Sequence, residues 1–467
     1  MRPPSFLPIR FLPVVLALFL IQLDFFSLGL ALPVISVDLG TTTTDLQWAL
    51  SAYMLTLGSL MIPASRLGDL VGRKRILLIG VATFGVASLL CGLSETPGQL
   101  IAARVLQGVG GAMIMPVAFS LVSNDTTSDE RPRILGLMLG LANIGTAVGP
   151  IVGGGLAASA GWRWVFWVNI PVAVVALVWG MRSLQDSRDP GDHRTSELDW
   201  LGAALVIAGV ATTTWGLDNL STLSILAVST GGAIVTGLVL LLLFARQESR
   251  HPWPLVSPQL MRRRSFVTIL IAGTVANVGY CIMMLVVTIQ LQQVRGLSSV
   301  VAGLLFVFPA LATAMSGPLS GRIAGRIPDG IVMGSAIVAG SLGLVLQAFA
   351  SSLVLDVVGL MISGLSFAMG YSFTNVATQS VLPVELSGQA SGVVITTIVT
   401  IGGVGVVLAA LGVEILGGGD LAQGTTATLL WSGVAGLVLG GLFLTQQSAA
   451  QRRSAHATNS GPAGSGG

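Results

Sequence analysis

The chain has 467 residues, of which 53% are apolar and only 9% are charged, with a formal net charge of +3. The mean hydropathy is +0.85, and no water-soluble domain of this size could cover itself with so few charged side chains. The composition therefore predicts a polytopic membrane protein and argues against a soluble enzyme.

Apolar segments of about twenty residues follow one another along the whole chain, each long enough to cross a bilayer as a helix. Lipid offers no partner to an open sheet edge, so we expect helices rather than strands. The fourteen segments cover residues 12–33, 47–66, 76–94, 98–121, 133–157, 163–182, 199–217, 222–245, 265–290, 299–321, 330–350, 353–376, 391–416 and 425–445. The division of 199–245 into two segments decides between fourteen helices and thirteen.

Basic residues are distributed unequally between the two sides of this series. With the N-terminus inside, Arg104 lies within a helix and only Arg163 and Arg295 fall outside, which leaves 20 of the 23 Lys and Arg residues in the cytoplasm. The positive-inside rule therefore predicts that both termini are cytoplasmic. Because Lys74 is the only lysine, as is typical of a GC-rich bacterial genome, we expect a multi-pass protein of a bacterial inner membrane.

A weak internal repeat predicts two equivalent halves. The stretch RLGD at 66–69, after the second segment, has an echo in RIAG at 322–325, after the tenth. Parallel repeats of this kind build transporters whose central site lies between the halves. The predicted domains are an N-terminal six-helix bundle (1–182), cytoplasmic linkers with two inserted helices (183–264), a C-terminal six-helix bundle (265–446) and a disordered cytoplasmic tail (447–467).

Two ionisable residues fall inside predicted membrane helices, Asp24 near the middle of the first and Arg104 in the fourth. A buried charge is costly in lipid, so each is a candidate functional residue. Asp24 can carry a proton, whereas Arg104 stays charged at any physiological pH and can only bias a nearby carboxylate or receive an anionic group. The alternative for both is a permanent structural ion pair, and the sequence does not show whether the two side chains touch.

Other polar residues within the helices are candidates for the wall of a central cavity, although interhelical hydrogen bonds explain such residues at least as often. The candidates are Gln22, Asn143, Asn277, Asn375 and Glu414. Asp356 lies at an outer helix end, where we expect it to act as a cap or a loop residue.

The fifth segment carries glycines at about four-residue spacing, namely Gly145, Gly149 followed by Pro150, and Gly153 with Gly154. Glycines at this spacing give a helix a flat face for close packing, and the proline permits a bend. We expect these residues to form a hinge at a rocking interface.

Alternatives to a gradient-driven transporter find no support in the motifs. The chain has no Walker-type phosphate loop, and its three histidines have no metal-ligand spacing. We therefore expect no ATP-driven pump in this chain, no cofactor and no metal. The cytoplasmic arginines flank membrane helices, so no nucleic-acid partner is expected.

Several stretches resemble, in order, motifs of the major facilitator superfamily and of its fourteen-helix drug:proton antiporter branch. They are LDFFSLGLALP (23–33), SRLGDLVGRKR (65–75), RVLQGVGGA (104–112), GTAVGPIVGG (145–154) and WRWVFWVNIP (162–171). The match is looser in the C-terminal half, where GPLSGR (317–322) and GQASG (388–392) carry it. This chain departs from the usual pattern at Ser65, Phe26 and Gly29.

The resemblance implies the major facilitator fold, with two six-helix bundles and two inserted helices. It also implies a monomeric, proton-coupled exporter of drugs or other small hydrophobic molecules that works by alternating access, with Asp24 and Arg104 in proton coupling. The charged loop after the second helix would gate the cytoplasmic side through Gly68, Asp69, Gly72 and Arg73. Two alternatives stay open: an exporter dedicated to one endogenous metabolite, lipid or siderophore, and a membrane sensor that transports nothing.

Overall fold

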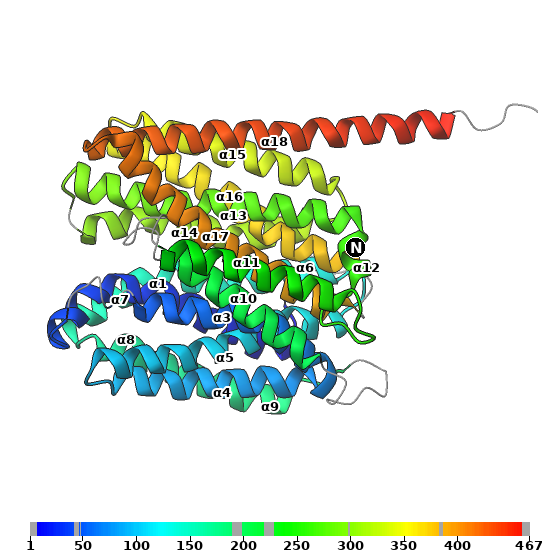
Figure 1. The fold of residues 1–467 in the computed structure, drawn as a ribbon, viewed down its shortest axis with the longest axis horizontal. Coiled ribbons are helices and arrows are strands. Elements are labelled where there is room, and N and C mark those ends of the chain that lie inside the picture. Colours follow the sequence, from blue (N-terminus) through cyan, green and yellow to red (C-terminus); the bar gives the residue numbers. More distant parts are fainter. Residues whose placement is uncertain are drawn as a thin grey trace, which may run out of the picture.

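The computed structural model describes residues 7–41, 46, 48–188, 199–218, 228–297, 299–382 and 386–459. Nearly all of these residues are helical, and none of them forms a strand. Long helices run side by side along one direction of the molecule and are joined by short turns (Figure 1). The prediction of an all-α membrane protein is therefore confirmed for the described part of the chain.

The N-terminal half is built from helices on residues up to Ser183. They are η1 (Ile9–Phe11), α1 (Leu12–Asp38), α3 (Trp48–Val71), α4 (Arg73–Gly92), α5 (Pro97–Asn124), α6 (Arg131–Ala142), α7 (Ile144–Ser159), α8 (Arg163–Trp167) and α9 (Asn169–Ser183). Helix α5 begins one residue before the predicted 98–121, because Thr96 Oγ1 accepts the amide of Gln99 at 3.3 Å and Pro97 occupies the first helical position.

Two helices lie between the halves, α10 (Trp200–Asp218) and α11 (Val228–Glu248), and a short α12 (Pro258–Arg262) follows them. The C-terminal half contains α13 (Arg264–Ile289), η3 (Gln290–Val294), α14 (Ser299–Ile323), α15 (Asp329–Ala348), α16 (Leu353–Val381), α17 (Ser387–Gly417) and α18 (Leu421–Asn459).

Thirteen helical stretches of the described chain are long and apolar enough to cross a membrane. The stretch Trp200–Gly216 of α10 is apolar but shorter than these. The count of fourteen spanning helices therefore stays a prediction. The stretch 222–227, predicted to begin the eighth span, lies outside the described residues, as does 189–198 of the predicted linker.

Two parts of the chain differ from the expected boundaries. The charged loop between the second and third spans is mostly helix, since α3 continues to Val71 and only Gly72 separates it from α4. Gly72 has φ +127°, a conformation that favours glycine. The tail predicted to be disordered continues α18 to Asn459, because alanine, glutamine and arginine favour a helix there; residues 460–467 lie outside the description.

Each half has an apolar core of its own. One joins α1, α3, α4, α5, α6 and α9 around residues such as Phe84 and Phe119, and another joins α13 to α17 around Phe367 and Phe373. A third core combines α10, α12, α13 and α17 with Ile62 of α3. The inserted helix α10 therefore packs against both halves, on α3 of one and α17 of the other.

The two ends of the helix bundle differ in charge. Basic residues gather at one end, which we call the basic end, and include Lys74, Arg75, Arg133, Arg182, Arg263 and Arg264. Arg163 and Arg295 lie at the opposite end, where Asp38 accepts hydrogen bonds from Trp162 Nε1 at 2.9 Å and from Arg163 at 2.8 Å. These two hydrogen bonds hold the pKa of Asp38 below its ordinary value of 3.8.

Candidate functional site

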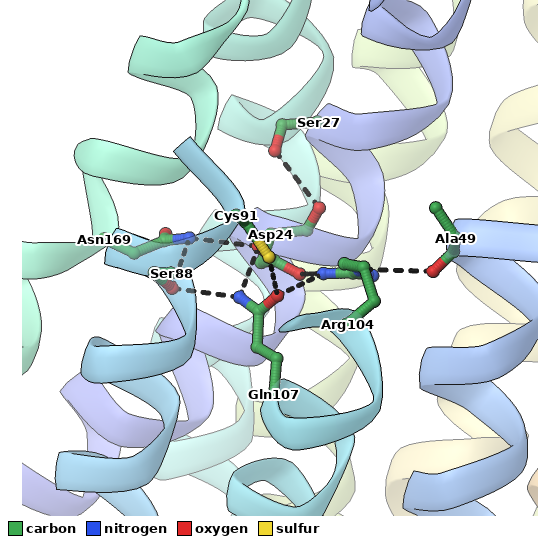
Figure 2. Close-up of polar contacts among 8 residues, drawn as sticks. All are labelled: Asp24, Ser27, Ala49, Ser88, Cys91, Arg104, Gln107 and Asn169. Atoms are coloured by element: carbon green, nitrogen blue, oxygen red, sulfur yellow. Dashed lines mark hydrogen bonds and ion pairs between the residues drawn. The ribbon is translucent and has the colours of Figure 1, made fainter. Parts of the chain in front are cut away.

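A buried polar network surrounds the carboxylate of Asp24 inside the N-terminal half (Figure 2). Four helices build it: α1 supplies Asp24, and α4, α5 and α9 supply its partners. The partner side chains are Ser88, Arg104, Gln107 and Asn169. These are polar positions within otherwise apolar helices, and each is held at the same depth as Asp24 by the packing of its helix.

The two oxygens of Asp24 have different partners. Oδ2 lies 2.5 Å from an Nη of Arg104 and forms an ion pair with it, whereas Oδ1 accepts from Gln107 Nε2 at 2.8 Å and from Asn169 Nδ2 at 3.0 Å. Ser88 Oγ accepts a second hydrogen bond from Gln107, at 2.9 Å. The Asp24 carboxyl group is therefore contacted by one cation and two amides, the kind of partners that a buried charge requires.

Arg104 is fully buried and makes three further contacts. It donates to the backbone oxygen of Ala49 at 3.1 Å and to Gln107 Oε1 at 2.6 Å, and its guanidinium lies 4.1 Å from the centre of the Tyr53 ring. The contact between Asp24 and Arg104, which the sequence left open, is thus a direct ion pair. Gln107 and Asn169 were not predicted, although both are polar residues at membrane depth within motifs that carry the family resemblance.

A cavity of about 380 Å³ lies between the two halves, near the middle of the bundle. Its wall combines α1, α3, α5 and α7 of the N-terminal half with α13, α14, α16 and α17 of the C-terminal half. Val210 and Thr214 of the inserted helix α10 also border it. No sequence signal marked these two residues, because only the packing of α10 across α3 and α17 brings them to the cavity.

Three of the five polar residues proposed for the cavity wall border it: Gln22, Asn143 and Asn277. The other two do not, and the prediction was wrong for them. Asn375 is 3% exposed and donates to the backbone oxygen of Tyr371 at 2.9 Å, within its own helix. Glu414 is exposed near the C-terminal end of α17 and does not border the cavity.

Asp24 itself does not border the cavity, although its neighbours Gln22, Phe25 and Phe26 do. Its side chain is 1% exposed and points into the N-terminal half. Tyr53 touches both regions, since it borders the cavity and stacks on Arg104. The ionisable pair and the cavity are therefore adjacent but distinct.

The halves meet closely at the basic end. Ser65 Oγ of α3 donates to the backbone oxygen of Gly388 in α17, and an Nη of Arg131 donates to the backbone oxygen of Gln379 at 3.0 Å. Deeper in the bundle, Thr396 donates to the backbone oxygen of Gly58 at 3.4 Å. The basic end is therefore closed in this structure, with the cavity beyond the seal.

The turn at Gly72 contributes to this seal. Asp69 Oδ1 accepts from Arg73 at 2.6 and 2.8 Å, and both side chains are almost fully buried. A Cβ at Gly388 would overlap the Asp69 carboxylate, which therefore sits against the first turn of α17. The partial positive charge of a helix N-terminus attracts a carboxylate, so Asp69 links the two halves electrostatically. Gly68 packs on Val117 of α5, where a Cβ would have only 3.0 Å.

The glycines of α7 pack against α1 of the same half, rather than against the other half. Added Cβ atoms at Gly145, Gly149 and Gly153 would meet α1 backbone or side chains within 2.7 Å. Gly154 is half-buried, and Pro150 lies within the continuous helix α7; the helix is interrupted at Asn143 instead. These three glycines therefore lie against α1, and their role as a hinge stays a prediction.

The glycines that join the halves belong to α6 and α14. A Cβ at Gly136 would overlap the backbone oxygen of Gly317 and lie 2.9 Å from Gly321 Cα. Gly140 is equally close to Pro318. Backbone meets backbone at this crossing, which small residues allow.

Asp356 was predicted to act as a helix cap or a loop residue, and this prediction was wrong. Ser352 caps α16 through the amide of Leu355 at 3.4 Å. Asp356 lies one turn further on, fully buried, and forms an ion pair with Arg295 at the end of η3.

Comparison with known proteins places this architecture in one family. The model of the Major Facilitator Superfamily matches residues 14–407. Multidrug resistance protein Stp of Mycobacterium tuberculosis (strain CDC 1551 / Oshkosh) is 31% identical over 383 residues, which cover 81% of this chain and 70% of Stp. The tetracenomycin C resistance and export protein of Streptomyces glaucescens is 30% identical over 389 residues, which cover 82% of this chain and 71% of that protein.

Two further similarities agree with these. Multidrug efflux pump LfrA of Mycolicibacterium smegmatis (strain ATCC 700084 / mc(2)155) is 31% identical over 317 residues, covering 68% of this chain and 62% of the pump. The crystal structure of the human organic anion transporter MFSD10 superposes with a TM-score of 0.65 at 15% identity, covering 92% of this chain and 98% of that one. The fold, the motifs and these matches lead to one assignment: the chain belongs to the major facilitator superfamily of membrane transporters.

Proposed function

We propose that this protein is a proton-coupled exporter of drugs or other small hydrophobic molecules in a bacterial inner membrane. The observation that carries the proposal is a cavity between two six-helix halves, closed at one end by contacts between the halves and flanked by a buried Asp–Arg pair. The multidrug and antibiotic resistance proteins that are about 30% identical to this chain support export of drug-like molecules.

The basic end faces the cytoplasm in this proposal, because basic residues collect on that side of membrane helices. Both termini are then cytoplasmic, and the closed basic end corresponds to a conformation in which the cavity can only communicate with the outside. The substrate binds when the basic end opens, and rocking of the two halves about the α6–α14 and α3–α17 crossings transfers the cavity to the other side.

Asp24 is the proposed proton carrier. In the cytoplasm-closed state its carboxylate is paired with Arg104, and a proton arriving from outside would neutralise it and release the guanidinium. That change favours the other conformation, in which Asp24 loses its proton to the cytoplasm. Proton and substrate need not share a site, because each only has to bias the same equilibrium between two conformations. The transporter works as a monomer and without a cofactor in this scheme.

The proposal is tested in inverted membrane vesicles that contain the protein and are energised by respiration. A panel of toxic compounds is added while the pH gradient is followed with a quenched acridine dye. Compounds that are substrates should partly dissipate the gradient in vesicles with the wild-type protein and not in vesicles with Asp24→Asn. Zero response to every compound, with binding retained, would favour a membrane sensor instead.

A dedicated exporter of one endogenous metabolite is the second candidate, and a specific observation favours it. One relative from Streptomyces is named for tetracenomycin C, and another, from Streptomyces alboniger, is named for puromycin at 33% identity over 313 residues. Growth of a pump-deficient strain that expresses this protein separates the candidates. Protection against many unrelated compounds supports a multidrug exporter, whereas protection against one compound or none supports a dedicated one.

A further inference from the structure

The wall of the central cavity contains no charged side chain among the residues that the structure describes. Its bulk is apolar and aromatic, and its polar members are amides, hydroxyls and one thiol. The aromatic residues are Phe25, Phe26, Tyr53, Tyr280 and Tyr371. A cavity of this size and composition suits a drug-sized molecule.

The charges nearest to the cavity are already neutralised. Asp24 is paired with Arg104 at 2.5 Å and does not border the cavity. The acidic residue of α17, Glu414, is exposed and does not border the cavity either. A cation entering this cavity would therefore exchange its hydration shell for neutral dipoles and aromatic rings without meeting a counter-charge, which is unfavourable.

Aromatic rings can stabilise a cation, but the Tyr53 ring, next to the ion pair, already has Arg104 over one face. Arg104 lies over the face of Tyr53 at 4.1 Å, so a guanidinium already covers this ring face. Phe25 and Phe26 are packed edge to face at 5.0 Å, an arrangement that directs the positive ring edge of one to the face of the other. These three rings therefore favour apolar contact rather than cation binding.

The polar groups of the wall suit a neutral ligand. Gln22 donates to Asn143 Oδ1 at 3.3 Å and to Thr146 at 3.2 Å. Amide groups supply N–H donors, and hydroxyls both donate and accept, so the neutral polar side chains of the wall can pair with carbonyl, ether or hydroxyl oxygens of a ligand.

From these observations we infer that the cavity selects uncharged, lipophilic molecules that carry hydrogen-bonding oxygens, and that it discriminates against permanent organic cations. The inference deepens the proposed export function and rests on it. It concerns only the substrate class, so it is tested by equilibrium binding rather than by transport.

Two probes that share a triphenylphosphorus core and differ in charge test the inference: triphenylphosphine oxide, which is neutral, and tetraphenylphosphonium, a permanent cation. Their binding to the purified full-length protein in detergent is measured by isothermal titration calorimetry. We expect the neutral probe to bind at least ~10-fold more tightly than the cation, because an unpaired charge is rejected by a neutral site.

Introducing a carboxylate into the wall should reverse the preference. Gln22→Glu preserves the shape of the side chain, and Asn277→Asp adds an acid from the other half of the protein. Each should tighten binding of tetraphenylphosphonium ~10-fold or more by supplying the missing counter-charge. Gln293→Glu is the control, because this exposed residue lies at the end of the bundle opposite the basic end and does not border the cavity. It adds the same charge and should change the affinity for neither probe.

The inference is overturned if the wild-type protein binds tetraphenylphosphonium as tightly as the neutral probe, or if it binds neither. It is also overturned if both acidic variants fold, as judged by gel filtration, and leave cation binding unchanged. Failure of the export function is a separate result, because the vesicle assay can give no pH response while the binding preference holds.

Discussion

Replacing Asp24 with asparagine removes the counter-charge of Arg104 and leaves a fully buried guanidinium. Breaking a buried ion pair by removing one partner costs about 3–5 kcal/mol. Arg104 keeps its hydrogen bonds to Ala49 O at 3.1 Å and Gln107 Oε1 at 2.6 Å, as well as the Tyr53 ring. These contacts place the expected loss of stability for Asp24→Asn near the lower limit, at about 3 kcal/mol.

Arg104→Gln should lower the free energy of unfolding by a similar amount. The Asp24 carboxylate then keeps only its hydrogen bonds from Gln107 at 2.8 Å and from Asn169 at 3.0 Å. The double variant contains neither buried charge. We therefore expect it to lose much less stability than the two single variants together, with a coupling energy of about 2–3 kcal/mol.

The assay is equilibrium unfolding of the purified protein in mixed micelles, followed through the fluorescence of its nine tryptophans. Additive losses, with a coupling energy below about 0.5 kcal/mol, would refute the reasoning that the two charges stabilise each other. The double variant also separates stability from transport. If it is stable but exports no substrate, the pair has a role in coupling, whereas full pH-dependent export would make the pair purely structural.

Three other changes test the seal at the basic end and the opposite end of the bundle. Gly136→Ala should force α6 away from α14 and shift the protein towards the state that is open at the basic end. The shift is detected as faster labelling of cysteines introduced at that end. Gly155→Ala is the control, because an added Cβ there meets nothing within 4 Å, and it should not change the labelling rate. Asp69→Asn should slow turnover more than it weakens substrate binding, since it removes the charge that faces the first turn of α17, and a pure loss of affinity would contradict this. Because the pKa of Asp38 is lowered, its contribution to stability is present above its ordinary value of 3.8 and is lost as the pH falls through the lower folded value. Thermal unfolding measured between pH 6 and 3 should therefore show a pH-dependent decrease in the wild type that is smaller in Asp38→Asn.

The helical architecture could be predicted because lipid restricts the chain so strongly. A run of about twenty apolar residues has to be a helix in a membrane, and basic residues mark the ends of such runs. The observed α13 (Arg264–Ile289) lies within one residue of the predicted 265–290 at each end. The prediction failed where charge did not end a helix, as at Ser65 to Val71, because those charges are buried in contacts between helices rather than exposed in a loop.

The candidate site could be predicted only in part. Asp24 and Arg104 stand out in the sequence because a charge inside an apolar run is rare. Their contact, and the exclusion of Asp24 from the cavity, depend on how α1 and α5 are rotated about their axes. Rotation also explains why Gln22 borders the cavity whereas Asn375 does not: both are amides in apolar helices, and nothing in their local sequence separates them.

The central claim is that a neutral compound leaves through this protein in exchange for protons, with Asp24 as the carrier. The most direct test is a substrate-induced change in the pH gradient of energised inverted vesicles, with an uncharged compound against which the protein protects a pump-deficient strain as the probe. The account predicts partial dissipation of the gradient with the wild-type protein and none with Asp24→Asn present at the same level in the membrane. An equal dissipation by the two proteins would contradict it.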